Sequence, residues 1–137
     1  MIESGVPVSA KKEFFQGIHD FNNDTFKIAL YTSAADLSLA GTTAYTATGE
    51  VAGPGYSPGG LILSGGAVAT DNGVAVVDFN DITFTGTTLS YQGALLYNSS
   101  KSNRAVLLVD FGPSDGAETD PKITFPAPSA VTAVIRM

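Results

Sequence analysis

The sequence predicts an all-β protein, an antiparallel β-sandwich of jelly-roll or Greek-key topology with one short N-terminal helix. About eight short runs of apolar and β-branched residues follow one another from Thr25 onward. Turn residues separate these runs at intervals of roughly 8–15 residues, the spacing of a sandwich. No helical pattern lies between the runs, which excludes an architecture of alternating strands and helices.

The chain length fits one domain. It has 137 residues, of which 44% are hydrophobic, enough for a packed core. We therefore expect residues 1–137 to form a single β-sandwich domain, in which residues 1–21 are an N-terminal arm with a short helix. The chain has no cysteine, which excludes disulfides and thiolate metal sites.

The first element is the helix. Ser9 is the expected N-cap of a helix that runs from residue 10 to about 19. Phe14, Ile18 and Phe21 follow an i, i+4, i+7 spacing and share one face of it.

The strands follow. Asn72-Gly73 between two apolar runs is a strong signal for a two-residue hairpin turn. Residues 33–60 are rich in small residues, glycine and proline, which predicts a long surface loop. The expected strands are residues 25–31, 61–63, 67–69, 74–77, 82–84, 89–97, 104–111, 122–125 and 131–136.

Alternation along these runs selects the side chains that we expect on the inner faces of the two sheets. They are Phe26, Ile28, Leu30, Val76, Phe79, Ile82, Phe84, Leu95, Leu107, Val109, Ile123, Phe125, Val131 and Ile135. Tyr31 and Tyr97 fall opposite this alternation or at strand ends, which favours surface tyrosines at a sheet edge. Because tyrosine is enriched in contact patches, the alternative is that they anchor an interface.

Charge and hydropathy exclude several classes of function. The net charge is −6 and no cluster of basic residues is present, so nucleic-acid binding is not expected. No run approaches the roughly 20 apolar residues that cross a bilayer. Glu3 and the lack of a basic residue before an apolar run argue against a secretory signal.

No constellation of catalytic residues is recognisable. His19 is the only histidine, and its place near the expected helix end favours a surface or capping residue. We expect no catalytic, cofactor-binding or metal-binding residues, and no enzymatic activity.

Two groups of carboxylates allow one alternative. One group is Asp78 and Asp81 with Asn80, and the other consists of Asp115, Glu118 and Asp120. Such residues usually form turns, and this is our expectation. The alternative is a structural Ca²⁺ site, since Ca²⁺ prefers oxygen ligands.

Several stretches together resemble a family of small virion proteins of tailed bacteriophages. The resemblance covers most of the chain from about residue 12 and rests on strands and turns rather than on a catalytic signature. The stretches are Thr25–Thr32, Gly49–Tyr56 with Gly59-Gly60, Gly93–Asn98, Arg104–Gly112, Ile123–Pro126 and Ala133–Arg136.

The resemblance implies a capsid cement, or decoration, protein that binds the outer surface of a phage capsid and stabilises it. Its partners would be the major capsid protein and copies of itself, as a homo-oligomer on the capsid. It would be made in the host bacterial cytoplasm and end in the virion. The alternative is a phage tail or fibre module involved in attachment or glycan binding. Neither function implies catalytic residues or a cofactor. Neither implies nucleic acid or a membrane as a partner.

Two segments are the expected contacts with such partners, residues 1–21 and 33–60. An isolated helix of about ten residues is unstable in water, so its apolar side chains need burial. The loop lies where binding segments concentrate. The alternative for the helix is that it only closes one end of the sandwich. The contact candidates are Phe14, Phe15, Ile18, Tyr45 and Tyr56.

Overall fold

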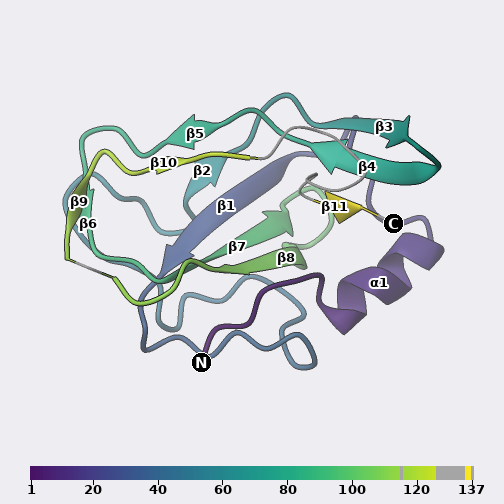
Figure 1. Ribbon diagram of the computed structural model, residues 1–137. Coiled ribbons are helices and arrows are strands. Elements are labelled where there is room, and N and C mark those ends of the chain that lie inside the picture. The colour runs from purple at the N-terminus through teal and green to yellow at the C-terminus, as the bar shows by residue number, and fades with distance from the viewer. Residues whose placement is uncertain (115, 126–134, 137) are drawn as a thin grey trace.

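The computed structural model describes residues 1–114, 116–125 and 135–136. They form a mostly β structure with antiparallel sheets and one short helix, as the sequence predicts (Figure 1). The elements are α1 (Val8–Phe15), β1 (Phe26–Tyr31), β2 (Leu61–Ile62), β3 (Ala67–Asp71), β4 (Val74–Asp78), β5 (Ile82–Thr83), β6 (Thr88–Leu89), β7 (Gly93–Asn98), β8 (Arg104–Asp110), β9 (Glu118–Thr119), β10 (Lys122–Ile123) and β11 (Ile135–Arg136).

The largest sheet has four strands in the order β2-β1-β7-β8. Its centre is the antiparallel pair β1 and β7, which runs from Phe26 opposite Asn98 to Tyr31 opposite Gly93. Three smaller sheets have the orders β11-β4-β3, β10-β5 and β6-β9. All the strand pairs are antiparallel.

A β-bulge interrupts the β7–β8 pair. Leu96 pairs with Leu107, but Tyr97 pairs with Ala105, so Val106 is the extra residue of β8. The bulge lets Val106 and Leu107 contribute to the same apolar cluster although they are consecutive. It therefore increases the apolar volume that β8 buries on one face.

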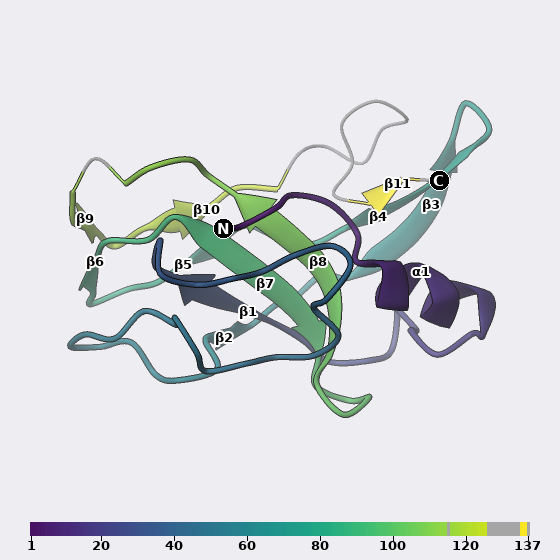
Figure 2. The same cartoon turned by 90° about the horizontal axis from the view of Figure 1, so that it is seen from below.

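The main sheet is covered on both faces, and Figures 1 and 2 show the two covers. On the first face, Phe26, Ile28 and Leu30 of β1 pack with residues in and just after the strands of the smaller sheets, among them Phe79, which follows β4, and Phe84, which follows β5. On the second face, irregular chain from residues 1–7 and 32–60 lies over β1, β7 and β8, although two residues of the loop, Val51 and Tyr56, pack into the first cluster. The two central strands, β1 and β7, are therefore buried on both faces.

The predicted core is largely confirmed. Ten of the expected side chains are buried: Phe26, Ile28, Leu30, Val76, Phe79, Phe84, Leu95, Leu107, Ile123 and Ile135. Ile82, Val109 and Phe125 are partly buried against the same core. Leu95 belongs to the opposite face, because it alternates with Ala94 and Leu96 along β7. Val131 lies outside the described residues.

The two strand tyrosines correct the prediction of surface tyrosines. Tyr31 and Tyr97 do point away from the first core, but both are buried. They lie in the second cluster with Leu37, which belongs to the segment expected as a surface loop. The alternation of the strands is correct, and the error is the assumption that only one face of the sheet is covered.

The helix is shorter than predicted and has a different cap. It begins at Val8 after Pro7, whose fixed φ suits a helix start, and no side chain caps it. Ser9 is inside the first turn and donates to the carbonyl of Thr42 (3.3 Å). The helix ends at Phe15, because Gly17 two residues later adopts φ +69°, which stops a helix.

The hairpin prediction at Asn72-Gly73 is confirmed. Both residues have positive φ (47° and 79°), as a two-residue type I′ turn requires. The expected strand over residues 89–97 is instead divided between β6 and β7. The two-residue strand β9 carries no apolar alternation and was not expected.

Candidate contact surface

The two faces of α1 differ in what they contact. Ala10 and Glu13 point inward and are buried, and Phe14 packs against the first core. The ring of Phe14 makes edge-to-face contacts with His19 (5.6 Å between centroids) and Phe21 (5.8 Å). Phe14 is therefore packed within the chain but only partly buried, and its role as a partner contact stays a prediction.

The outward face of α1 carries Val8, Lys11, Lys12 and Phe15, at the i, i+3, i+4, i+7 spacing of one helical stripe. All four residues are exposed, and Phe15 is 86% exposed. Within the described part of the chain, neither lysine has an ion pair. We call these four residues the helix face. Ile18, beyond the end of α1, is half-buried.

A buried carboxylate fixes α1 against the main sheet. Glu13 accepts a hydrogen bond from Arg104 of β8 (Nη1 to Oε2, 3.0 Å). Its other oxygen lies 2.9 Å from Nε2 of His19. Because Glu13 is buried and both its oxygens are paired, the helix has one defined orientation on the sheet.

His19 is not the surface or capping residue that the sequence suggested. Its side chain is 0% exposed. Nδ1 lies 3.0 Å from Nδ2 of Asn98, a fully buried residue at the end of β7. No signal in the sequence joins these residues, which are 79 positions apart.

The hydrogen bonds of Asn98 assign the tautomer of His19. Nδ2 of Asn98 also donates to Asp24 (2.8 Å), and its Oδ1 accepts from the backbone of Ser100 (3.0 Å). The amide group is therefore the donor toward His19, and Nδ1 of the ring is the acceptor. Nε2 then carries the proton and donates to Glu13.

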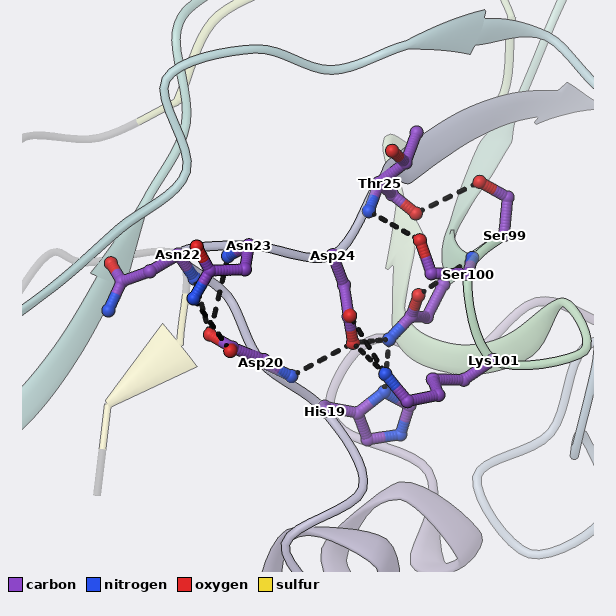
Figure 3. A network of polar contacts seen from close by, with 10 residues as sticks. His19, Asp20, Asn22, Asn23, Asp24, Thr25, Ser99, Ser100 and Lys101 are labelled. Atoms are coloured by element: carbon purple, nitrogen blue, oxygen red, sulfur yellow. Dashed lines mark hydrogen bonds and ion pairs between the residues drawn. The ribbon is translucent and has the colours of Figure 1, made fainter.

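Asp24 completes this network. Figure 3 shows Asp24 and Lys101 facing each other beside the His19 ring, with Nζ of Lys101 2.8 Å from Oδ1 of Asp24. Burial raises the pKa of the Asp24 carboxyl, but the hydrogen bonds from Lys101, Asn98 and the Asp20 backbone outweigh it and bring that pKa to about 2. The network ties residues 19–25 to the β7–β8 turn.

The other two contact candidates, Tyr45 and Tyr56, lie in a second polar cluster centred on Glu50. Tyr45 donates to Oε1 of Glu50 (2.5 Å) and Tyr56 to Oε2 (2.6 Å). The backbone N–H of Gly59 also donates to Oε2 (2.8 Å). Glu50 therefore gathers three donors from one loop.

The same cluster attaches the loop to the sheet. The hydroxyl of Tyr97 donates to the carbonyl of Gly59 (2.6 Å), and the ring of Tyr45 stacks on Tyr97 at 5.0 Å. Tyr56 accepts from the backbone N–H of Leu30 (3.0 Å) and is only 8% exposed. Tyr45 and Tyr56 thus hold the loop onto the chain's own sheet, and their role as anchors for a partner stays a prediction.

Three of the carboxylates proposed as an alternative Ca²⁺ site accept hydrogen bonds from residues 27 to 44 positions away, rather than within the local turns that the sequence suggested. Asp81 accepts from the backbone N–H of Phe125 (2.8 Å), and Asp120 accepts from that of Gly86 (2.7 Å). Glu118 accepts from the hydroxyl of Tyr91 (2.9 Å). Among residues 1–114, 116–125 and 135–136, no group of three or more acidic, histidine or cysteine side chains is placed to hold a metal ion. Asp115 lies outside the described residues.

Comparison of the chain with protein-family models, with curated proteins and with solved structures finds no match. Within the described residues, no helix is long and apolar enough to cross a membrane. Any function of the helix face is therefore inferred from its geometry alone.

Proposed function

We propose that this protein is a capsid cement protein of a tailed bacteriophage, a β-sandwich of jelly-roll or Greek-key type that binds the outer capsid surface and reinforces it. The proposed partners are the major capsid protein and further copies of the chain, and the proposed location is the virion. The resemblance of the strands and turns to small phage virion proteins is its starting point.

The observation that carries the proposal is the helix face. A phenylalanine that is 86% exposed is unusual in a monomeric protein, and here it lies beside Val8 and two lysines that have no ion pair among the described residues. The Glu13 network holds this face in one orientation, so binding need not order it first. A partner surface with an apolar pocket rimmed by carboxylates matches it.

Copy number in the virion tests the proposal directly. Virions are purified from the phage that encodes the chain, and the molar ratio of the chain to the major capsid protein is measured by quantitative mass spectrometry. A ratio of about one, or a simple fraction of it set by capsid symmetry, is expected. A chain present in tens of copies, or absent, would overturn the proposal.

Substitution of Phe15 tests the surface. Burying a phenylalanine contributes about 1.5–3 kcal/mol, so Phe15→Ser should weaken capsid binding about 10- to 100-fold. The matched control is Ile62→Ser on β2, since Ile62 is also exposed (63%) but lies on another part of the molecule. Both variants should melt like the unchanged chain. Equal capsid occupancy for both would exclude the helix face.

The tail or fibre module remains the second candidate, because an aromatic pair lies at the surface. Phe111, which is partly exposed, meets Tyr91 edge to face at 5.6 Å, and a shallow pocket adjoins them. Such a pair can stack on a sugar ring. Low copy number together with glycan binding that is lost in Phe111→Ser would favour this function.

A further inference from the structure

We propose that the free edge of β3 pairs antiparallel with the same edge of a second copy, joining the two β11-β4-β3 sheets across a two-fold axis. β3 is the outer strand of that sheet in the described structure, with β4 as its only neighbour. The β3–β4 hairpin projects beyond the rest of the molecule, so a second copy can reach it (Figure 2).

The outward backbone groups of β3 follow from the turn. A two-residue hairpin closes on a hydrogen-bonded pair, here Asp71 with Val74. Hydrogen-bonded pairs recur at every second residue of the strand. Ala69 and Ala67 therefore also direct their backbone N–H and C=O groups to β4. The N–H and C=O groups of Val68 and Thr70 therefore point outward, and outside the β3–β4 ladder no described residue hydrogen-bonds to them.

The edge also lacks the devices that normally prevent strand pairing. Its first four residues, Ala67 to Thr70, include no charge and no proline, and Val68 is 47% exposed. The edges of the main sheet differ. Gly5 exchanges two backbone hydrogen bonds with Leu108 of β8 (both 2.9 Å), and β2 is only two residues long.

The strand is complementary to itself, which identifies the second copy as the occupant. In a two-fold pairing centred on Ala69, Val68 lies opposite Thr70 of the other copy, a favourable pair of β-branched residues. Each Asp71 then lies opposite an alanine. The two Asp71 positions are about 13 Å apart along the strands, beyond the Debye length of about 8 Å at physiological salt.

Net charge sets the direction of the salt effect. Each copy carries a formal charge of −6, so two copies repel one another at long range. Because the proposed contact is made of backbone hydrogen bonds and small side chains, salt screens the repulsion without weakening the contact. Dimerisation should therefore strengthen as salt is added. It occurs in the free chain and does not depend on capsid binding.

Sedimentation velocity of the purified chain over a range of concentrations, at low and high salt, tests this inference. A monomer–dimer equilibrium is expected, with more dimer at high salt. Val68→Lys places a charge on the edge, and Thr70→Pro removes an outward N–H without breaking the ladder to β4. Each should raise the dimer dissociation constant about tenfold or more.

The matched control is Ala75→Lys, which makes the same change in net charge within the same hairpin but on β4, away from the free edge. It should dimerise at least as well as the unchanged chain. A chain that stays monomeric at about 1 mM in high salt would overturn the inference. Dimerisation of Val68→Lys equal to that of Ala75→Lys would also overturn it, since the contact would then lie elsewhere.

Discussion

The two faces of the main sheet are buried by different kinds of chain. The strands of the smaller sheets and the residues that follow them cover the first face, where side chains such as Val77, Phe79 and Phe84 form one cluster with those of β1. The second face is covered by residues 1–7 and 32–60, which contain no strand of their own beyond isolated bridges and which also place Val51 and Tyr56 in the first cluster. The alternation of apolar residues specifies the cover of the first face. Individual hydrogen bonds specify the cover of the second face.

The second cover shows how an irregular segment can serve as a structural layer. Its backbone groups need partners because they lie against a buried sheet. The hydroxyl of Tyr31 donates to the carbonyl of Thr46 (2.6 Å), and Glu50 accepts from the backbone N–H of Gly59 (2.8 Å). Tyrosines suit this purpose, since their rings fill the apolar layer and their hydroxyls reach the loop backbone.

Alkaline pH should have the largest effect, because it acts on both covers through all five tyrosines. Burial, followed by the negative charge of Glu50, raises the pKa of Tyr97 to about 12, and burial with Glu118 does the same for Tyr91. Burial first, and then Glu50, also raises the pKa values of Tyr31, Tyr45 and Tyr56.

The unfolded chain ionises its tyrosines near pH 10, whereas the folded chain keeps them protonated. Stability should therefore be complete below pH 10 and fall as pH rises above it. Ultraviolet absorbance of tyrosinate and circular dichroism should change together, above the pH at which free tyrosine ionises. Ionisation of several tyrosines near pH 10 in the folded chain would show that the second cover is open.

Phe84→Ala should produce the largest effect of a single substitution and tests the strand-built cover. Phe84 is buried and stacks on Tyr56 at 5.8 Å, so the truncation leaves a cavity in the first core. The expected loss of unfolding free energy is about 3–5 kcal/mol, measured by urea titration. An unchanged midpoint would contradict the placement of Phe84 in the first core.

Glu50→Ala tests the hydrogen-bonded cover and should cost about 2–4 kcal/mol, because it leaves three donors without their acceptor. Glu50→Gln keeps one acceptor oxygen and the shape of the side chain, so its loss should be about half as large. The same urea titration measures both variants. Equal losses would mean that packing, rather than hydrogen bonding, holds the loop.

Sequence reasoning succeeded where a local pattern determines the structure. Alternation placed Phe26, Ile28 and Leu30 in the core, and Asn72-Gly73 gave the hairpin turn. It failed where the partner is distant in the chain. The pattern along β1 assigns Tyr31 to the other face but carries no information on what covers that face.

The candidate site shows the same division. The prediction that Phe14, Ile18 and Phe21 share one helix face is wrong, because α1 ends at Phe15, although the rings of Phe14 and Phe21 do pack together. Nothing local to His19 or Glu13 indicates Asn98 or Arg104, so the network that orients α1 was missed. The roles of Tyr45 and Tyr56 depend on their hydrogen bonds to Glu50. A glycine- and proline-rich composition predicts a loop and gives no sign of such a hydrogen-bonded cluster.

Native-state hydrogen exchange of the free protein tests most directly whether residues 32–60 are a structural layer. The decisive amides are those of Thr32, Tyr45 and Val51, which donate to the carbonyls of Gly49, Asn103 and Leu30 (all 2.9 Å). We predict that they exchange as slowly as the amides of β1 and β7, through global unfolding. Exchange at the rate of an open loop, while β1 stays protected, would contradict the account.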